Sequence, residues 1–216
     1  MEPKKRSLGA AERDEFLRAA WRLLTAGKID AERLVFVDEC GANTSLSPLY
    51  AWARTGERAR CEAPRNWGSN VTLLASMGLS GMGPCVAVEG TTTGAVFEAY
   101  LENVLAPSLR PGQVLVMDNL SSHKGPRVRK LIERRGCELL YLPPYSPDLN
   151  PIEQAFSKLK ASLRRAGART FEALIEAMGR ALERSPTGTP GASSSTAATA
   201  PWPNRYDRRS SRALFR

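Results

Sequence analysis

The sequence predicts an α/β fold, in which strands and helices share one sheet, and three features lead to that prediction. Short apolar runs rich in β-branched and aromatic residues, bounded by glycine, proline or acidic residues, are typical of strands. Other segments repeat apolar residues every three or four positions, as amphipathic helices do. A strand, a helix and a second strand follow one another between residues 113 and 142, an order that favours a right-handed parallel crossover.

The first 33 residues predict one helix and a connector. Apolar residues recur there at helical spacing and form one stripe, made of Phe16, Leu17, Ala20, Trp21 and Leu24. Gly27 supplies a stop signal for this helix. We expect the apolar stripe to pack against the core of the protein.

The middle of the chain predicts strands followed by a helix. Strands are expected at residues 34–37, 71–77 and 85–88, with a less regular candidate at 50–53. Trp52, in that less regular segment, is expected to pack in the core. A helix is expected from residue 94 to residue 105, because apolar residues recur at helical spacing until Pro107 ends the pattern.

The second half predicts a parallel unit and two further helices. Residues 113–117 form a continuous apolar run, typical of a strand covered on both faces of a sheet. The elements expected after it are a basic helix at 125–135, a strand at 138–142 and helices at 151–165 and 171–182. Residues 185–216 are rich in Pro, Ser, Thr and Ala and contain no Val, Ile or Met, so they predict a disordered tail.

Composition narrows the classes of protein. The 216 residues carry a net charge of +9, which favours a polyanionic partner such as nucleic acid. No apolar stretch approaches the roughly 18 residues of a membrane helix, and the N-terminus has no secretory apolar run. We therefore expect a cytoplasmic protein without membrane contact. Four scattered cysteines and a single histidine exclude a structural zinc site.

Three acidic residues stand where a metal site would need them. Asp38 and Asp118 each follow an apolar strand, and Glu153 lies in the first turn of a predicted helix. Ligands of open α/β sheets gather beyond the carboxyl ends of strands, so the two aspartates converge if their strands are neighbours. Such oxygen-rich clusters suit Mg²⁺ or Mn²⁺, and two ions about 4 Å apart stabilise both the attacking and the leaving oxygen of a phosphoryl displacement.

Each acid also has a structural interpretation, and the local sequence leaves both open. Asn150, Pro151 and Glu153 match the N-cap, the first helical residue and the capping-box position of a helix. Asp118 also suits a turn, in which its side chain bonds to the nearby backbone. Asp38 suits a strand end without a metal, and the neighbouring Glu39 suits the metal role as well.

Three blocks of the sequence resemble the signature blocks of a known family. They are VFVDECGANTSLSPLYAWARTGER, VLVMDNLSSHK and LLYLPPYSPDLNPIEQAFSKLK. These blocks are similar to those of bacterial mariner-like insertion-sequence transposases, a group within the DDE superfamily of RNase H-like endonucleases, which also includes retroviral integrases. The 34 residues between Asp118 and Glu153 match the group's spacing of the second and third acids. The similarity extends from about Leu34 to Glu183.

The resemblance implies a fold and a reaction. The implied fold is RNase H-like, an α/β mixed sheet of about five strands flanked by helices, with the first three strands antiparallel. Asp38, Asp118 and Glu153 would be the catalytic, metal-binding triad for Mg²⁺ or Mn²⁺, with two ions expected. The implied reaction is nicking at transposon ends followed by attack of the freed 3′-hydroxyl on target DNA. Transposon-end and target DNA are thus the expected partners, and a homodimer is left open.

The resemblance also divides the chain and raises alternatives. Residues 1–33 are expected to be a helical connector, 34–184 the DDE catalytic domain and 185–216 a disordered basic tail. Family members carry an N-terminal helix-turn-helix region, and only 33 residues precede the first strand here, so we expect a truncated, decayed or split reading frame with a frameshifted tail. One alternative is a catalytically inactive, DNA-binding remnant of an insertion element. Another is a host nuclease for RNA–DNA hybrids, against which the PPYSPDLNPIE block argues.

Four residues are candidates for contact with DNA. His123 and Lys124 follow the second acid within DNLSSHK, and a structural, hydrogen-bonded role suits His123 equally well. Lys160 and Arg164 lie on the polar side of the helix that begins near Glu153, where a solvated basic surface is the simpler interpretation. Phosphate contacts by these cations would make DNA affinity fall steeply with salt.

Overall fold

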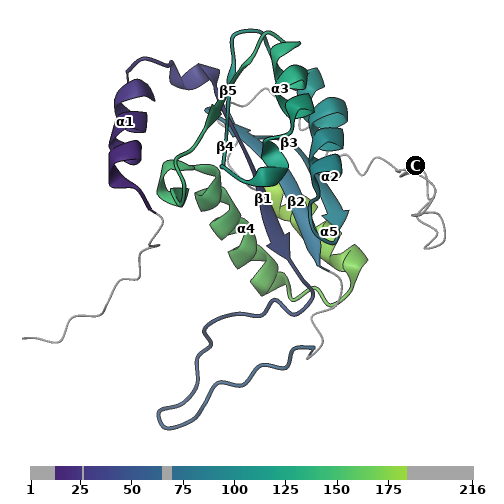
Figure 1. Cartoon of the computed structure of the whole chain (residues 1–216). Helices are drawn as coiled ribbons and strands as arrows, with labels where there is room; N and C mark the ends of the chain where they lie inside the picture. The colour runs from purple at the N-terminus through teal and green to yellow at the C-terminus, as the bar shows by residue number, and fades with distance from the viewer. Residues whose placement is uncertain (1–12, 26, 65–69, 184–216) are drawn as a thin grey trace, which may run out of the picture.

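The computed structural model describes residues 13–25, 27–64 and 70–183, and they contain one five-stranded sheet of order β3-β2-β1-β4-β5 (Figure 1). The strands are β1 (Leu34–Ala42), β2 (Val71–Gly78), β3 (Gly81–Glu89), β4 (Val114–Met117) and β5 (Glu138–Tyr141). β1 pairs antiparallel with β2, as β2 does with β3, whereas β4 lies parallel to both β1 and β5. The predicted mixed sheet, its antiparallel first three strands and its parallel crossover are confirmed.

Two strands extend further than the apolar pattern predicts. β1 continues past residue 37 because β2 stays paired with it as far as Ala42. β3 begins at Gly81 instead of residue 85, because a two-residue turn brings Gly78 opposite Gly81. The φ of Gly81 is 111°, a conformation that residues with a side chain rarely adopt. No strand forms at residues 50–53, and the prediction that Trp52 packs in the core is wrong, because the segment lies in solvent and the side chain is fully exposed.

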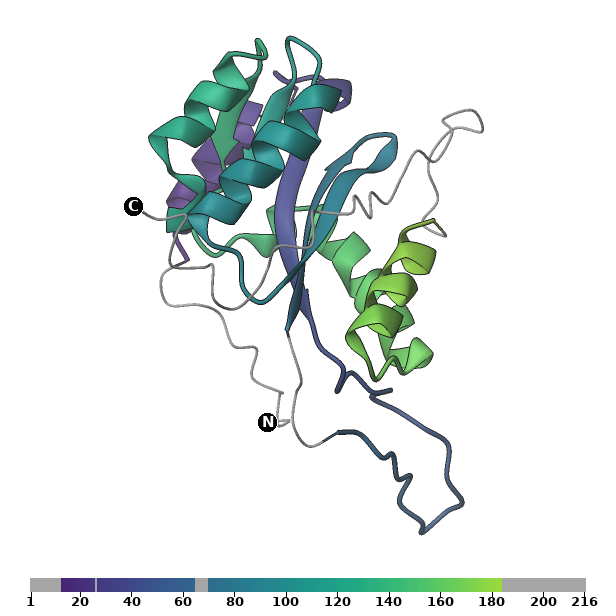
Figure 2. The same ribbon diagram turned by 90° about the vertical axis from the view of Figure 1, so that its right-hand side faces the viewer.

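Two pairs of helices cover the two faces of the sheet (Figure 2). The helices are α2 (Gly94–Tyr100), which continues as a π-helical turn to Leu105, α3 (Pro126–Glu133), α4 (Ile152–Ala166) and α5 (Phe171–Glu183). Val35 and Val37 of β1 belong to the core beneath α2 and α3, whereas Cys40 belongs to the core beneath α4 and α5. Because side chains alternate along a strand, Asp38 faces α4.

The first helix, α1 (Glu15–Thr25), forms where it is predicted, but only part of its apolar stripe packs against the core. Phe16 is 80% exposed and Leu24 is 64% exposed. Trp21 of the same stripe is half-buried and packs against the core around Val116. Its indole N–H donates to the carbonyl oxygen of Tyr141, the last residue of β5, at 3.1 Å. The buried Arg18 guanidinium donates to both carboxylate oxygens of Asp148, at 3.0 and 2.5 Å. The expectation of a core-packing stripe is therefore confirmed for Trp21 and wrong for Phe16 and Leu24.

A long segment between β1 and β2, residues 43–64, extends away from the sheet and its helices (Figure 1). It exposes the large apolar side chains of Leu49 and Tyr50. The guanidinium of Arg169, just before α5, holds its first residues by donating to the carbonyl oxygens of Thr44 and Leu46 at 2.8 and 2.9 Å. The segment is therefore fixed to the domain at its base.

Two further predictions concern the tail and the membrane. The tail predicted to be disordered, residues 185–216, lies outside the described residues. Among the helices of the described ranges, none has the length and apolar character needed to cross a bilayer.

Candidate active site

Asp38 lies in the middle of β1, where that strand loses its parallel neighbour. Val37 is the last residue of β1 that pairs with β4, while the pairing with β2 continues beyond it. Asp38 is only 7% exposed. Its Oδ1 accepts a hydrogen bond from the backbone N–H of Glu39 at 2.7 Å, and its Oδ2 accepts one from the side-chain amide of Asn150 at 2.8 Å. The predicted strand end at Asp38 is thus the end of the parallel pairing and not of the strand.

Asp118 directly follows β4, whose last residue, Met117, pairs with Val37. The two aspartates therefore follow residues that lie opposite each other on neighbouring parallel strands. The Oδ1 of Asp118 accepts from the backbone N–H of Leu120 at 3.2 Å and lies 2.6 Å from Nδ1 of His123. The turn interaction considered for Asp118 is therefore present, and because both contacts end on Oδ1, Oδ2 is the oxygen available to a cation.

Glu153 lies exposed in the first turn of α4. The capping-box interpretation of this residue is wrong. The N-cap of α4 is Pro151, and no side chain makes a capping hydrogen bond there. Asn150, which the sequence suggests as the N-cap, donates its side-chain amide to Asp38, and its Oδ1, the atom that would accept a capping bond, has no hydrogen-bond partner among the described residues.

The three acids are electrostatically coupled at Asp38. The pKa of Asp38 is raised from 3.8 to about 7. Burial is the largest cause of this higher pKa, and the negative charges of Asp118 and Glu153 add to it, while the N–H of Glu39 and His123 act in the opposite direction. Charges shift a pKa strongly only at short range. The fold thus brings Asp118 and Glu153, from distant parts of the chain, near enough to Asp38 for their charges to act on its carboxyl group.

Metal binding by these acids stays a prediction. Within the described ranges, no group of three or more His, Cys, Asp or Glu side chains is arranged so that it could hold a metal ion. The donor chemistry nevertheless fits one, because carboxylate oxygens are the ligands of Mg²⁺ and Mn²⁺. A buried carboxylate whose pKa is raised to about 7 beside two further acids is an environment that a cation would stabilise.

The four candidate DNA contacts lie in different surroundings. His123 is fully buried, whereas Lys124 beside it is exposed. Lys160 and Arg164 of α4 are half-buried. Burial raises the pKa of the Cys40 thiol on β1, and the ammonium group of Lys160 opposes this rise, so Lys160 lies against β1. Lys124 is thus accessible to a partner from solvent, and His123 is not.

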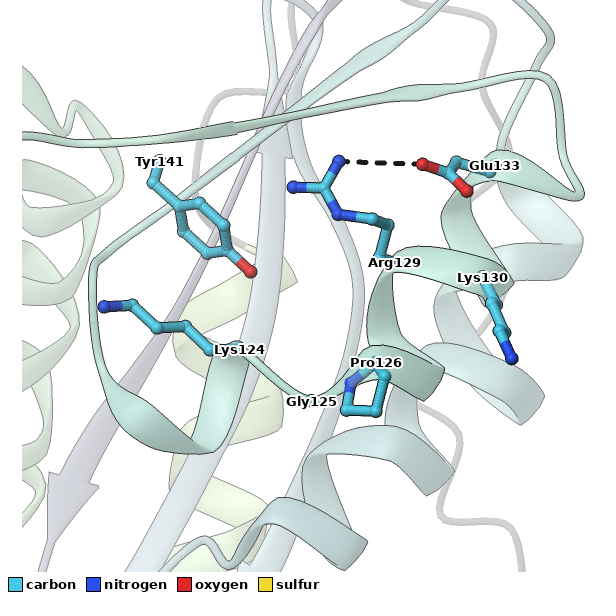
Figure 3. Close-up of a pocket in the computed structure, with 7 residues that line it drawn as sticks. All are labelled: Lys124, Gly125, Pro126, Arg129, Lys130, Glu133 and Tyr141. Atoms are coloured by element: carbon cyan, nitrogen blue, oxygen red, sulfur yellow. Dashed lines mark ion pairs between the residues drawn. The ribbon is translucent and has the colours of Figure 1, made fainter.

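A basic pocket of about 390 Å³ opens between the start of α3 and the end of β5. Its lining residues are Lys124, Gly125, Pro126, Arg129, Lys130, Glu133 and Tyr141 (Figure 3). Arg129 and Glu133 form an ion pair of 3.6 Å on one side of it. The hydroxyl of Tyr141 donates to the carbonyl oxygen of His123 at 2.8 Å, which connects the pocket wall to the residue that contacts Asp118. With three cations and one acid in its lining, the pocket would attract an anion.

Two side chains that shape the site were not predicted from the sequence. Asn150 was assigned to a helix cap, although its position three residues before Glu153 offered a signal that it lies close to the acids. Arg18 had no signal, because its partner Asp148 is 130 residues away. Asp148 belongs to the 3-10 turn Pro147–Leu149, which directly precedes Asn150. Arg18 therefore anchors the turn that presents Asn150 to Asp38.

The sequence of this chain is similar to a protein family and to known transposases. The family model described as DDE superfamily endonuclease matches residues 33–175. The Tcb1 transposase of Caenorhabditis briggsae is 31% identical over 116 residues, which are 52% of this chain and 42% of that protein. The Tc1 transposase of Caenorhabditis elegans is 26% identical over 165 residues, which are 71% of this chain and 60% of that protein. The chain thus spans between 42% and 60% of the length of these relatives.

Solved structures of Mos1 complexes share the fold. The Mos1 strand transfer complex has a TM-score of 0.65 at 22% identity, over 85% of this chain and 59% of that chain. The Mos1 mariner paired-end complex with Mn has a TM-score of 0.64 at 21% identity, over 85% of this chain and 60% of that chain. At this level of identity the likeness concerns the fold, which is RNase H-like as the sequence resemblance implies.

Proposed function

This chain belongs to the DDE superfamily of endonucleases, and we propose that it is the catalytic part of a transposase of the Tc1/mariner group. The observation that carries the proposal is the place of the buried Asp38, which follows Val37 just as Asp118 follows its strand partner Met117, and which faces α4, the helix that carries Glu153. The transposases among its relatives support it. The bacterial insertion-sequence branch, and the division into a connector (1–33) and a catalytic domain (34–184), stay predictions.

The proposed reaction is metal-dependent cleavage of DNA followed by strand transfer. Asp38, Asp118 and Glu153 would hold Mg²⁺ or Mn²⁺, which, when bound, activate a water or 3′-hydroxyl nucleophile and stabilise the leaving oxygen. Solved Mos1 paired-end complexes with Mn and with Mg support this choice of ions. In this chain the amide of Asn150 and the N–H of Glu39 orient the Asp38 carboxylate through its two oxygens.

DNA is the proposed partner, both as transposon ends and as target. Mos1 has been solved as a paired-end complex with a left transposon end. In this chain the net charge of +9 and the basic pocket lined by Lys124 support contact with a phosphate backbone. Lys124 is the pocket residue nearest in sequence to Asp118, so it is the first cation to test.

Replacing Lys124 with glutamine is expected to weaken DNA binding several-fold and to reduce its dependence on salt. Each phosphate contact contributes about 0.9 to the slope of log affinity against log salt on duplex DNA, so the slope should fall by about that amount. Fluorescence anisotropy with a duplex oligonucleotide measures both quantities. Lys28→Gln serves as the matched control, because it removes an exposed lysine that lies before the first residue of β1 and does not line the pocket. Equal slopes for Lys124→Gln and the wild type would remove the pocket from the proposed interface.

Nicking of supercoiled plasmid in Mn²⁺ tests the proposed activity directly. Asp118→Asn and Glu153→Gln should each reduce nicking by on the order of a thousandfold, because metal-held charge stabilisation is worth several kcal/mol. Glu172→Gln removes a glutamate from the first turn of α5 and should nick like the wild type. Equal nicking by the wild type and Asp118→Asn would contradict the proposal. If the wild type binds DNA but does not nick it, the chain is better explained as an inactive remnant. If the wild type cleaves RNA–DNA hybrids but not plasmid DNA, a host nuclease is favoured.

A further inference from the structure

His123 makes a closer contact with a proposed metal ligand than any sequence pattern suggests. The ring is fully buried, and its Nδ1 lies 2.6 Å from Oδ1 of Asp118. The centroid of the ring lies 4.1 Å from that of Phe97 on α2. The Tyr141 hydroxyl fixes the backbone by donating to the carbonyl oxygen of His123 at 2.8 Å. The imidazole is thus held on one side by a core aromatic and on the other by Asp118.

The short contact determines which nitrogen carries the proton. An ionised carboxylate offers only acceptors, so an unprotonated Nδ1 would place two acceptors 2.6 Å apart. Nδ1 is therefore the donor. Nε2 is buried and has no hydrogen-bond partner among the described residues. The bond to Asp118 is consequently the one polar interaction of this ring within the described structure.

We propose that His123 is a positioning residue, which donates from Nδ1 to Oδ1 of Asp118 and so holds Oδ2 toward the divalent cation. The inference rests on the proposed function, in which Asp118 is a metal ligand. Groups that hydrogen-bond a metal ligand fix its orientation, and their removal typically costs about 10- to 100-fold in metal affinity or activity. The N–H of Leu120, at 3.2 Å, supports the same oxygen, so Asp118 is held by two donors from its own turn.

The competing explanation is that His123 only fills space against Phe97. Three variants separate the two explanations. His123→Asn keeps an N–H donor near the position of Nδ1 but loses part of the ring. His123→Gln carries the same amide at about the reach of Nε2, where it does not meet Oδ1. His123→Phe keeps the ring volume and the contact with Phe97 but has no donor.

Mn²⁺ binding to the DNA-free protein, measured by calorimetric titration, tests the inference without depending on activity. We expect His123→Phe and His123→Gln to bind Mn²⁺ about 10- to 100-fold more weakly than the wild type, and His123→Asn to remain within a few-fold of it. Thermal unfolding shows that each variant is folded, and the Asn and Gln pair decides the matter if the Phe variant does not fold. Wild-type affinity in the Phe or Gln variant, or equal weakening in Asn and Gln, would overturn the inference.

Mn²⁺ binding by Asp118→Asn separates an error in the role of His123 from an error in the proposed function. If Asp118→Asn binds Mn²⁺ as well as the wild type does, Asp118 is no ligand and the proposed function itself is contradicted. If Asp118→Asn loses Mn²⁺ while His123→Phe and His123→Gln keep it, the site stands and only the positioning role of His123 falls.

Discussion

Replacing Asp38 with asparagine is expected to abolish metal-dependent nicking and, at the same time, to stabilise the metal-free protein above neutral pH. The loss of nicking follows because the amide keeps the shape of the carboxylate but not its charge. A reduction of on the order of a thousandfold is expected, since the metal supplies several kcal/mol of charge stabilisation. The gain in stability follows from the raised pKa of Asp38.

The sign of the stability change depends on pH. The pKa of Asp38 is about 7 in the folded protein and 3.8 as its ordinary value, so the folded state binds the proton more tightly than the unfolded chain. The stability contributed by this group is fully present below about pH 3.8 and is lost as pH rises through about 7. Asparagine is neutral throughout, so Asp38→Asn should raise the Tm at pH 8 by several degrees and have little effect at the acid end of that range.

The fold offers a matched control for this measurement. Asp30 is exposed and caps the 3-10 turn Ala31–Arg33 by accepting from the N–H of Glu32. Asparagine caps such turns about as well as aspartate does, so Asp30→Asn should leave both the Tm and nicking unchanged. A lower Tm for Asp38→Asn than for the wild type at pH 8 would mean that burial of the charged carboxylate does not destabilise the metal-free fold.

The affinity for Mn²⁺ is expected to fall about fiftyfold between pH 7 and pH 5, with a slope that approaches about tenfold per pH unit at the acid end. A carboxylate must be ionised to bind a metal, and the raised pKa of Asp38, caused chiefly by burial, makes a proton compete with the cation throughout this range. An ordinary surface carboxylate would begin to lose affinity only near pH 4. Calorimetric titrations at four or five pH values measure the slope.

His123→Asn is the control that assigns the slope to Asp38. His123 is the only histidine of the chain, so this variant removes every imidazole while keeping a donor near Asp118. The same slope in His123→Asn attributes the titration to Asp38. An affinity that does not change between pH 5 and pH 7 would contradict the assignment of a raised pKa to a metal-binding Asp38.

The sheet was predictable from the sequence because its strands coincide with short runs of apolar residues. The run Val114–Met117 is buried at every position and leaves one assignment, a central strand. Asp38 and Asp118 were predicted at the ends of such runs. They lie on neighbouring strands in the structure because Val37 pairs with Met117. The end of β1 was missed because pairing with β2, which no local pattern reveals, extends the strand to Ala42.

Two of the unpredicted features depend on partners distant in sequence. The apolar stripe of α1 suggested burial along its whole length, but Phe16 and Leu24 are exposed, and Arg18 holds the helix by binding Asp148 across 130 residues. Asn150 has the sequence of a helix cap and contacts Asp38, 112 residues away. Local propensity describes what a residue does with its neighbours, and here tertiary hydrogen bonds replaced those local options.

Crystals of the wild-type protein soaked in Mn²⁺, with data collected at the manganese absorption edge, test most directly whether the three acids form one metal centre. Anomalous density between Asp38, Asp118 and Glu153, with carboxylate oxygens within about 2.3 Å of the ion, is the predicted result. Manganese bound elsewhere on the protein, with these three side chains unliganded, would contradict it.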